Sequence, residues 1–167
     1  TQPVLCKDFF IDEEQVYRAR YFGADAILLM LSVLNDGQYT TLRDIADSLS
    51  MDVLTEVANE EEMQRAVKLD ARIIGINHRD LTDLSIDPNR SAELAPLAPQ
   101  GALLVAESGF STHADIRRVA PYVNGFLVGS ALSAQPNVDL ACRELLFGQN
   151  KVCGLTRPED AINARSQ

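Results

Sequence analysis

Short apolar segments recur along the chain, and their regular spacing restricts the possible folds more than any other feature. The segments are rich in Val, Ile and Leu, and runs of this kind are typical of strands buried on both faces. Amphipathic stretches that fit helices lie between them. The predicted strands are Val4–Cys6, Ala26–Leu31, Val53–Leu54, Ile73–Ile76, Ala102–Val105 and Phe126–Val128.

The stretches between the strands carry helix-start signals. Capping residues are expected at Asp12, at Asn59, at Asp87 before Pro88, and at Ser111 or Thr112. Gly23 is placed to end the first helix. A strand followed by a helix, repeated about six times, implies a parallel sheet with right-handed crossovers.

Two architectures fit this alternation, an open doubly wound sheet and a (β/α)8 barrel, and periodicity alone does not separate them. Polar residues stand just past the strand ends in almost every unit. Barrel active sites are built from such a ring, whereas an open sheet concentrates its ligand groups at one switch point. We therefore predict an α/β fold of the (β/α)8 TIM-barrel type. The ring consists of Lys7, Ser32, Glu56, Asn77, Glu107 with Ser108, and Gly129 with Ser130.

Composition excludes several classes of protein. The formal charge of −9 and pI near 4.6 argue against a nucleic-acid or membrane-surface partner. Backbone N–H groups can still bind phosphate in an acidic protein. The apolar runs fall short of the roughly 18 residues that a membrane span needs. Three widely separated cysteines favour reduced thiols and a cytoplasmic location, and two histidines without a Cys-x-x-Cys pair predict no metal.

Four of the strand-end residues are candidates for catalysis, three for proton transfer and one for positioning the substrate. Lys7 can serve as a general acid, or it is simply a solvated loop lysine. Glu56 and Glu107 end apolar strands, where a carboxylate is either a catalytic group or the partner of a lysine in an ion pair. Asn77 can position a hydroxyl or carboxylate, or cap its turn. The parity of His78 directs its side chain away from that of Asn77.

Two small-residue pairs end the last two predicted strands, Ser108-Gly109 and Gly129-Ser130. Small residues allow the backbone to approach an anion, and a barrel often binds phosphate after its last two strands. One such pair is a common turn. Two in consecutive units predict a phosphate site, and hence a small phosphorylated substrate.

Five segments together resemble indole-3-glycerol-phosphate synthase, in that family's order and at about its spacing, over residues 2 to about 148. They are Pro3-Val-Leu-Cys-Lys-Asp-Phe9, Leu54-Thr-Glu-Val57, Gly75-Ile-Asn-His-Arg-Asp-Leu81, Glu107-Ser-Gly109 and Gly129-Ser-Ala-Leu132. The resemblance implies a barrel whose strands 3 to 8 are present here. It implies ring closure of 1-(2-carboxyphenylamino)-1-deoxyribulose 5-phosphate, with loss of carbon dioxide and water and without a cofactor, as part of tryptophan biosynthesis.

The resemblance also implies a role for each matched residue. Lys7 would be the general acid, Glu56 its partner in proton transfer, Asn77 a substrate-positioning group, and Glu107 a member of the polar network. Ser108, Gly109, Gly129 and Ser130 would hold the phosphate. Phe9 and Leu28 would form walls of the anthranilate pocket.

A second, shorter resemblance begins after Gly148. Asn150-Lys-Val-Cys-Gly-Leu-Thr-Arg157 is similar to the start of phosphoribosylanthranilate isomerase, which is fused behind the synthase in some bacteria. We therefore expect a partial synthase barrel over residues 1–148, and a linker with the first isomerase strand over 149–167. Cys153 would be the acid–base cysteine of that family, or merely a buried strand cysteine here, and we expect no isomerase activity.

On this alignment the family's strands 1 and 2 and its N-terminal segment are absent, so strands 3 and 8 would have open edges. Exposed edges favour self-association. We expect the isolated chain to be inactive, and either to associate with itself or to be completed by the absent segment. Two other interpretations are a non-catalytic fragment of the bifunctional enzyme and another phosphate-binding barrel enzyme.

Overall fold

The computed structural model describes residues 2–81, 83–148 and 157–159. Six strands form one sheet in which all neighbouring pairs are parallel. Every predicted strand is present, with ends that differ by a few residues at most. The strands are β1 (Leu5–Cys6), β2 (Ala26–Met30), β3 (Asp52–Val57), β4 (Ile73–Asn77), β5 (Leu103–Glu107) and β6 (Gly125–Leu127).

Helices connect the strands in the predicted alternation. The α-helices are α1 (Glu13–Tyr21), α2 (Asp36–Ser48), α3 (Glu60–Lys68), α4 (Arg90–Leu94), α5 (His113–Val119), α6 (Ser130–Ser133) and α7 (Val138–Phe147). Two short 3-10 turns, η1 (Ala95–Leu97) and η2 (Ala120–Tyr122), extend α4 and α5.

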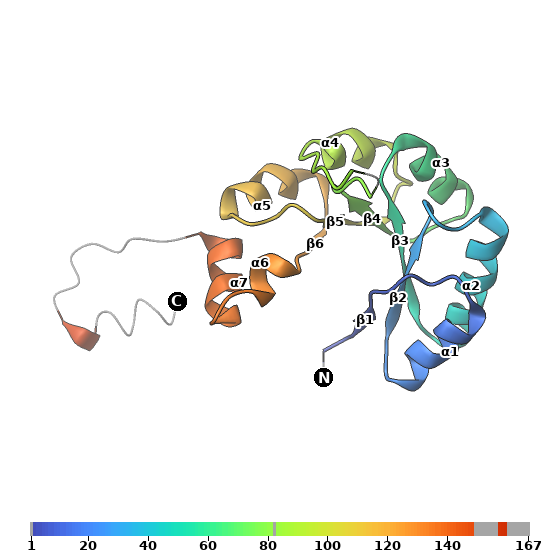
Figure 1. The fold of residues 1–167 in the computed structure, drawn as a ribbon. Helices are drawn as coiled ribbons and strands as arrows, with labels where there is room; N and C mark the ends of the chain where they lie inside the picture. Colours follow the sequence, from blue (N-terminus) through green and yellow to red (C-terminus); the bar gives the residue numbers. More distant parts are fainter. Residues whose placement is uncertain (1, 82, 149–156, 160–167) are drawn as a thin grey trace.

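The order of the strands distinguishes the two architectures. They lie side by side in sequence order from β1 to β6, whereas a doubly wound sheet reverses its order at a switch point. The sheet curls, and the helices follow one another around its outer side (Figure 1). The fold is therefore a partial (β/α)8 TIM barrel, as predicted.

Alternating side chains give the sheet two apolar faces. Ile27 and Leu29 of β2 pack outward in the larger core beneath the helices. Leu28 and Met30 of the same strand face inward and pack with Leu54 of β3. The strands therefore read as continuous apolar runs because both of their faces are covered. This inner apolar cluster lies beneath the polar residues at the carboxyl ends of the strands.

Most of the predicted helix caps are present. The side chain of Asp12 accepts a hydrogen bond from the backbone N of Glu14, and the side chain of Thr112 rather than Ser111 caps α5. The side chain of Asn59 accepts from the backbone N of Glu62. Gly23 has a φ of +93°, a left-handed conformation that suits a residue following a helix.

The predicted cap at Asp87 is wrong. Helix α4 begins two residues after Pro88, at Arg90, with Asn89 in the N-cap position. The Asp87 carboxylate instead accepts a hydrogen bond from the backbone N of Asn89, at 2.9 Å. This local Asx turn satisfies the carboxylate and delays the helix.

No helix in the described part of the chain is long and apolar enough to cross a membrane. The predicted linker and isomerase-like strand span residues 149–167, of which the structure describes 157–159, so Cys153 lies outside the described residues.

Candidate active site

Lys7, Glu56 and Glu107 come together at the carboxyl ends of three different strands. The Nζ atom of Lys7 lies 3.5 Å from Oε2 of Glu56 and 3.4 Å from Oε2 of Glu107. Both carboxyl side chains are almost fully buried, whereas that of Lys7 is 40% exposed. One cation that solvent can reach thus lies between two buried acids.

Strand register explains this convergence. Asn77, the last residue of β4, pairs with Glu107, the last residue of β5. Glu56 of β3 pairs with Gly75, which precedes Asn77 by two residues on β4. Side chains on parallel neighbours at matched positions point to the same face. The acids on β3 and β5 therefore both face the barrel interior, and they do so across β4.

Asn77 is held by both ends of its amide. Its Nδ2 atom donates to Oε1 of Glu56 at 2.9 Å, and its Oδ1 atom accepts from the backbone N of Arg79 at 3.0 Å. The Arg90 guanidinium donates to the Asn77 backbone carbonyl at 2.8 Å. The two side-chain bonds fix the orientation of the amide, and through it one oxygen of Glu56.

Glu107 has the most unusual electrostatic environment of the three. Burial and the nearby Glu56 carboxylate raise the pKa of Glu107 to about 7, and Lys7 opposes the shift. Within the described residues, neither oxygen of Glu107 has a hydrogen-bond partner, so Lys7 acts on it as a nearby charge. A carboxyl group that exchanges its proton near neutral pH can act as an acid or a base.

A cavity of about 230 Å³ adjoins this cluster. All four residues of the two predicted phosphate pairs line it, together with Lys7, the only catalytic candidate among its lining residues. Arg79 adds a second cation to its wall. The remaining lining residues are Phe110, Leu127, Val128 and Ala131.

The backbone at Ser108-Gly109 is in an unusual conformation. Both residues have positive φ angles, +68° and +82°. A methyl group on Gly109 would approach Cγ2 of Ile86 to 2.6 Å, so this glycine is also needed for loop packing. Positive φ at Ser108 is strained for a residue with a side chain, and such strain is concentrated at functional sites.

The two predicted pocket-wall residues lie in different surroundings. Phe9 is 59% exposed beside the strand-end loop, where its backbone N donates to Asp8. Leu28 is buried in the inner apolar cluster with Met30 and Leu54.

Sequence reasoning did not assign Arg79 or Gly75 to the site. Arg79 follows Asn77 by two residues, and this shared parity was the available signal. His78 points outward as predicted, and its side chain is buried. Its Nε2 atom lies 2.7 Å from Oγ of Ser91, and its ring packs against that of Phe110.

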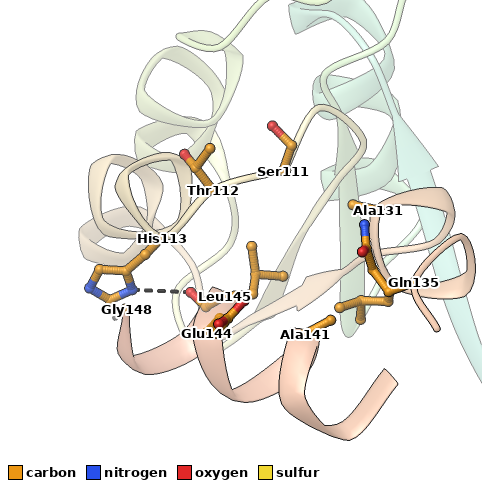
Figure 2. A pocket seen from close by; sticks show the side chains of 10 residues that line it. Ser111, Thr112, His113, Ala131, Gln135, Ala141, Glu144, Leu145 and Gly148 are labelled. Atoms are coloured by element: carbon orange, nitrogen blue, oxygen red, sulfur yellow. Dashed lines mark hydrogen bonds between the residues drawn. The ribbon is translucent and has the colours of Figure 1, made fainter. Parts of the chain in front are cut away.

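A second cavity, of about 330 Å³, lies among α5, α6 and α7 and includes none of the predicted site residues (Figure 2). There Nδ1 of His113 lies 3.0 Å from the carbonyl oxygen of Leu145, which ties α5 to α7 (Figure 2). Ala131 lines both cavities, so helix α6 separates them. Among residues 2–81, 83–148 and 157–159, no three His, Cys, Asp or Glu side chains form a group that could hold a metal ion.

Comparisons with known proteins identify the family to which this chain is similar. The chain is 58% identical over 163 residues to the tryptophan biosynthesis protein TrpCF of Vibrio cholerae, covering 98% of this chain and 35% of that protein. It is 58% identical over 164 residues to TrpCF of Corynebacterium glutamicum, with the same coverage of each chain. TrpCF of Helicobacter pylori is 54% identical over 161 residues, covering 96% of this chain and 36% of the relative.

The chain thus spans about a third of the length of these relatives. The family model described as indole-3-glycerol phosphate synthase matches residues 1–145, which include every predicted site residue except Cys153. The chain belongs to the indole-3-glycerol phosphate synthase family.

Proposed function

We propose that this chain supplies most of an active site that converts 1-(2-carboxyphenylamino)-1-deoxyribulose 5-phosphate to indole-3-glycerol phosphate, carbon dioxide and water. The observation that carries the proposal is the position of Lys7 between Glu56 and Glu107, at the edge of a cavity lined by the two small-residue pairs. The relatives are named as tryptophan biosynthesis proteins, which supports the choice of substrate.

The cluster offers the proton transfers that this reaction needs. Ring closure requires an acid on the ribulose carbonyl, and we assign it to Lys7, the cluster member that solvent reaches and that lines the cavity. Dehydration then requires removal of one proton and protonation of the departing hydroxyl. We assign one of these transfers to Glu56. Its Oε1 atom accepts a hydrogen bond from Asn77, and its Oε2 atom lies near Lys7. Glu107, with its pKa of about 7, is the reservoir that lets Lys7 recover its proton.

The phosphate is assigned to the cavity wall made by Ser108, Gly109, Gly129 and Ser130. Gly129 and Ser130 are exposed, and a side chain added at Gly129 would contact nothing within 4 Å. The wall is therefore open to a bulky anion. Lys7 and Arg79, which line the same cavity, provide the positive charge that a dianion needs.

We propose that two further strands complete the barrel. Within the described residues, β1 and β6 each pair on one side only. The surfaces next to these edges are apolar: Phe22 beside α1 is 79% exposed, and Phe147 of α7 is 67% exposed. The greater length of the relatives supports completion within one polypeptide, and self-association of two copies is the competing possibility.

The length of the relatives also supports the prediction that residues 149–167 lead into an isomerase domain. The isomerase domain stays a prediction. So do the role of Cys153 and the cytoplasmic location.

The test is the fluorescence of the indole product. The chain is incubated with the substrate, alone and with a segment that supplies the two missing strands from the Vibrio cholerae relative. Lys7→Ala is the inactive variant, and Lys68→Ala, an exposed lysine on α3, is its matched control. Product that forms only in the completed barrel, and is lost with Lys7→Ala but not with Lys68→Ala, is the expected result. A completed, folded barrel that forms no product would overturn the proposal.

A further inference from the structure

Gly75 occupies the one inward-facing position on β4 where a side chain would collide with an acid of the site. It lies in the middle of the strand, buried, and pairs with Glu56 on one side and Val105 on the other. A methyl group built on its Cα would overlap Oε1 of Glu107 and come within 3.1 Å of the carboxyl carbon. A glycine inside a strand often marks the close approach of another group.

The overlap means that Glu107 does not extend straight out from its own strand. Its register partner on β4 is Asn77, yet its carboxylate lies over Gly75, two residues nearer the start of that strand. Leu54 forms the floor, since its Cδ1 atom would lie 3.4 Å from the added methyl group. The carboxylate thus fills the volume that any other residue at position 75 would claim.

This displaced position accounts for the surroundings of Glu107. Its side chain is 1% exposed, and within the described part of the chain its oxygens receive no hydrogen bond. The Lys7 ammonium group lies 3.4 Å from Oε2 of Glu107, and the Glu56 carboxylate is close enough to raise the pKa of Glu107. A carboxylate directed outward from the strand end would reach solvent at the mouth of the barrel instead.

We propose that Gly75 is a positioning residue, whose missing side chain creates the space that holds the Glu107 carboxylate inside the barrel beside Lys7. The importance of this space for catalysis rests on the proposed function. The location of the carboxylate does not, and it can be tested without any substrate.

The direct test is carbon-13 NMR of glutamate side chains, with the Glu107 signal assigned by its loss in Glu107→Gln. Gly75→Ala should push the carboxylate toward solvent, because Leu54 blocks the opposite direction. Its titration midpoint should then fall by at least one pH unit from the value near 7. The matched control is Gly125→Ala on β6, where an added methyl group would meet nothing within 4 Å and the midpoint should not move. An unchanged midpoint in folded Gly75→Ala would overturn the proposal.

A double-mutant comparison covers the case in which Gly75→Ala fails to fold. The urea midpoint is measured for Gly75→Ala alone and in the Glu107→Ala background, where the overlap no longer exists. The proposal is supported if Gly75→Ala costs much stability in the wild type and little in the Glu107→Ala background. It is also supported if Gly75→Ala folds only when Glu107→Ala is present. Equal losses in the two backgrounds, or failure to fold in both, would place the obstacle at Leu54 or in the backbone and sink the idea.

A kinetic measurement then connects the position to catalysis. In the completed barrel, Gly75→Ala should lower kcat by tenfold or more with little change in KM, and it should shift the pH profile of kcat in the same direction as the NMR midpoint. Gly75→Ala with Glu107→Asp should recover part of the rate, because the shorter acid needs less room. If the unmodified barrel forms no product, the proposed function fails while the NMR result still decides the role of Gly75. A shifted NMR midpoint with unchanged kcat would refute the importance of this space for catalysis, while the location of the carboxylate would stand as proposed.

Discussion

The ammonium group of Lys7 lies 3.5 Å from the Glu56 carboxylate, although 49 residues separate the two in the chain. The contact exists because β1 and β3 flank β2 in a curled parallel sheet, which directs their ends toward a common axis. This ion pair joins β1 to β3 across β2, so it depends on the curvature of the sheet as well as on the two charges. Its consequences can be measured with single substitutions.

Removing the cation should make the neighbouring acid harder to ionise. Lys7 lowers the pKa of Glu107, so Lys7→Ala should raise its titration midpoint above the value near 7. Carbon-13 NMR of the Glu107 side chain measures this midpoint directly. A midpoint that falls or stays fixed in Lys7→Ala would show that the lysine is not close to the acid in solution.

Glu107→Gln should remove a specific pH dependence of stability. Because the pKa of Glu107 is raised from 4.5 to about 7 in the folded state, the native protein binds more protons than the unfolded chain between these values. Stability should therefore fall as the pH rises from 4.5 to 7. The effect is about 3 kcal/mol, taking 1.36 kcal/mol for each pH unit.

Urea unfolding of both proteins at pH 4.5, 6 and 8 tests this expectation. The glutamine variant should gain in relative stability as the pH rises, and the gain should level off above pH 7. Two stability curves that run parallel across this range would contradict it.

His78 should produce a pH dependence of the opposite sign. Burial, followed by the Arg90 charge, lowers the pKa of His78 from 6.5 to about 4. The unfolded chain binds the extra proton between these values, so the stability that this residue contributes should be complete above pH 6.5 and lost as the pH falls toward 4. His78→Gln keeps a group that can bond Ser91 but cannot titrate.

The same urea series, extended down to pH 4, measures the effect. The wild type should lose about 3 kcal/mol more than the glutamine variant across the window. An equal acid sensitivity of the two proteins would mean that the imidazole reaches solvent or a carboxylate.

The sequence predicts the polar residues at the strand ends, but it does not predict the part played by Gly75. Glu56, Asn77 and Glu107 belong to the predicted ring of strand-end residues. The register of the strands puts their side chains on one face, because side-chain direction alternates along a strand. The sequence does not predict that Glu107 leans back over Gly75, since that depends on side-chain torsions and on empty volume on a neighbouring strand. The misplaced cap at Asp87 has a similar origin, because an Asx turn and a helix cap use the same residue types.

Ser130→Glu should weaken substrate binding with little effect on stability. Ser130 is exposed and lines the cavity assigned to phosphate, so a carboxylate there would repel the dianion. In the completed barrel, KM should rise at least tenfold while the thermal midpoint stays within about 2 °C. Ser133→Glu, on the same short helix but absent from the lining of that cavity, is the control. Equal KM values for Ser130→Glu and Ser133→Glu would show that the substrate phosphate does not bind at this wall of the cavity.

Arg65 should be far more important for stability than an ordinary surface arginine. From α3 its guanidinium donates to the carbonyls of Leu31 and Leu34, at 2.6 and 2.7 Å, and to the Asp36 carboxylate at 2.8 Å. These bonds hold the loop that follows β2 at the carboxyl end of the sheet. Lysine keeps the charge but lacks the planar fork, so Arg65→Lys leaves partly buried carbonyls unpaired and should cost about 2–3 kcal/mol.

Arg72→Lys is the matched control for this loop contact. Arg72 is 71% exposed on its side chain and makes an ion pair with Asp47, an exposed contact that contributes about 0–1 kcal/mol. Urea unfolding of the two variants at one pH compares them directly. Because the difference between the variants arises from the two backbone carbonyls, equal losses would show that the loop after β2 is held by its own packing. A loss confined to Arg65→Lys would instead show that α3 anchors this part of the rim of the candidate active site.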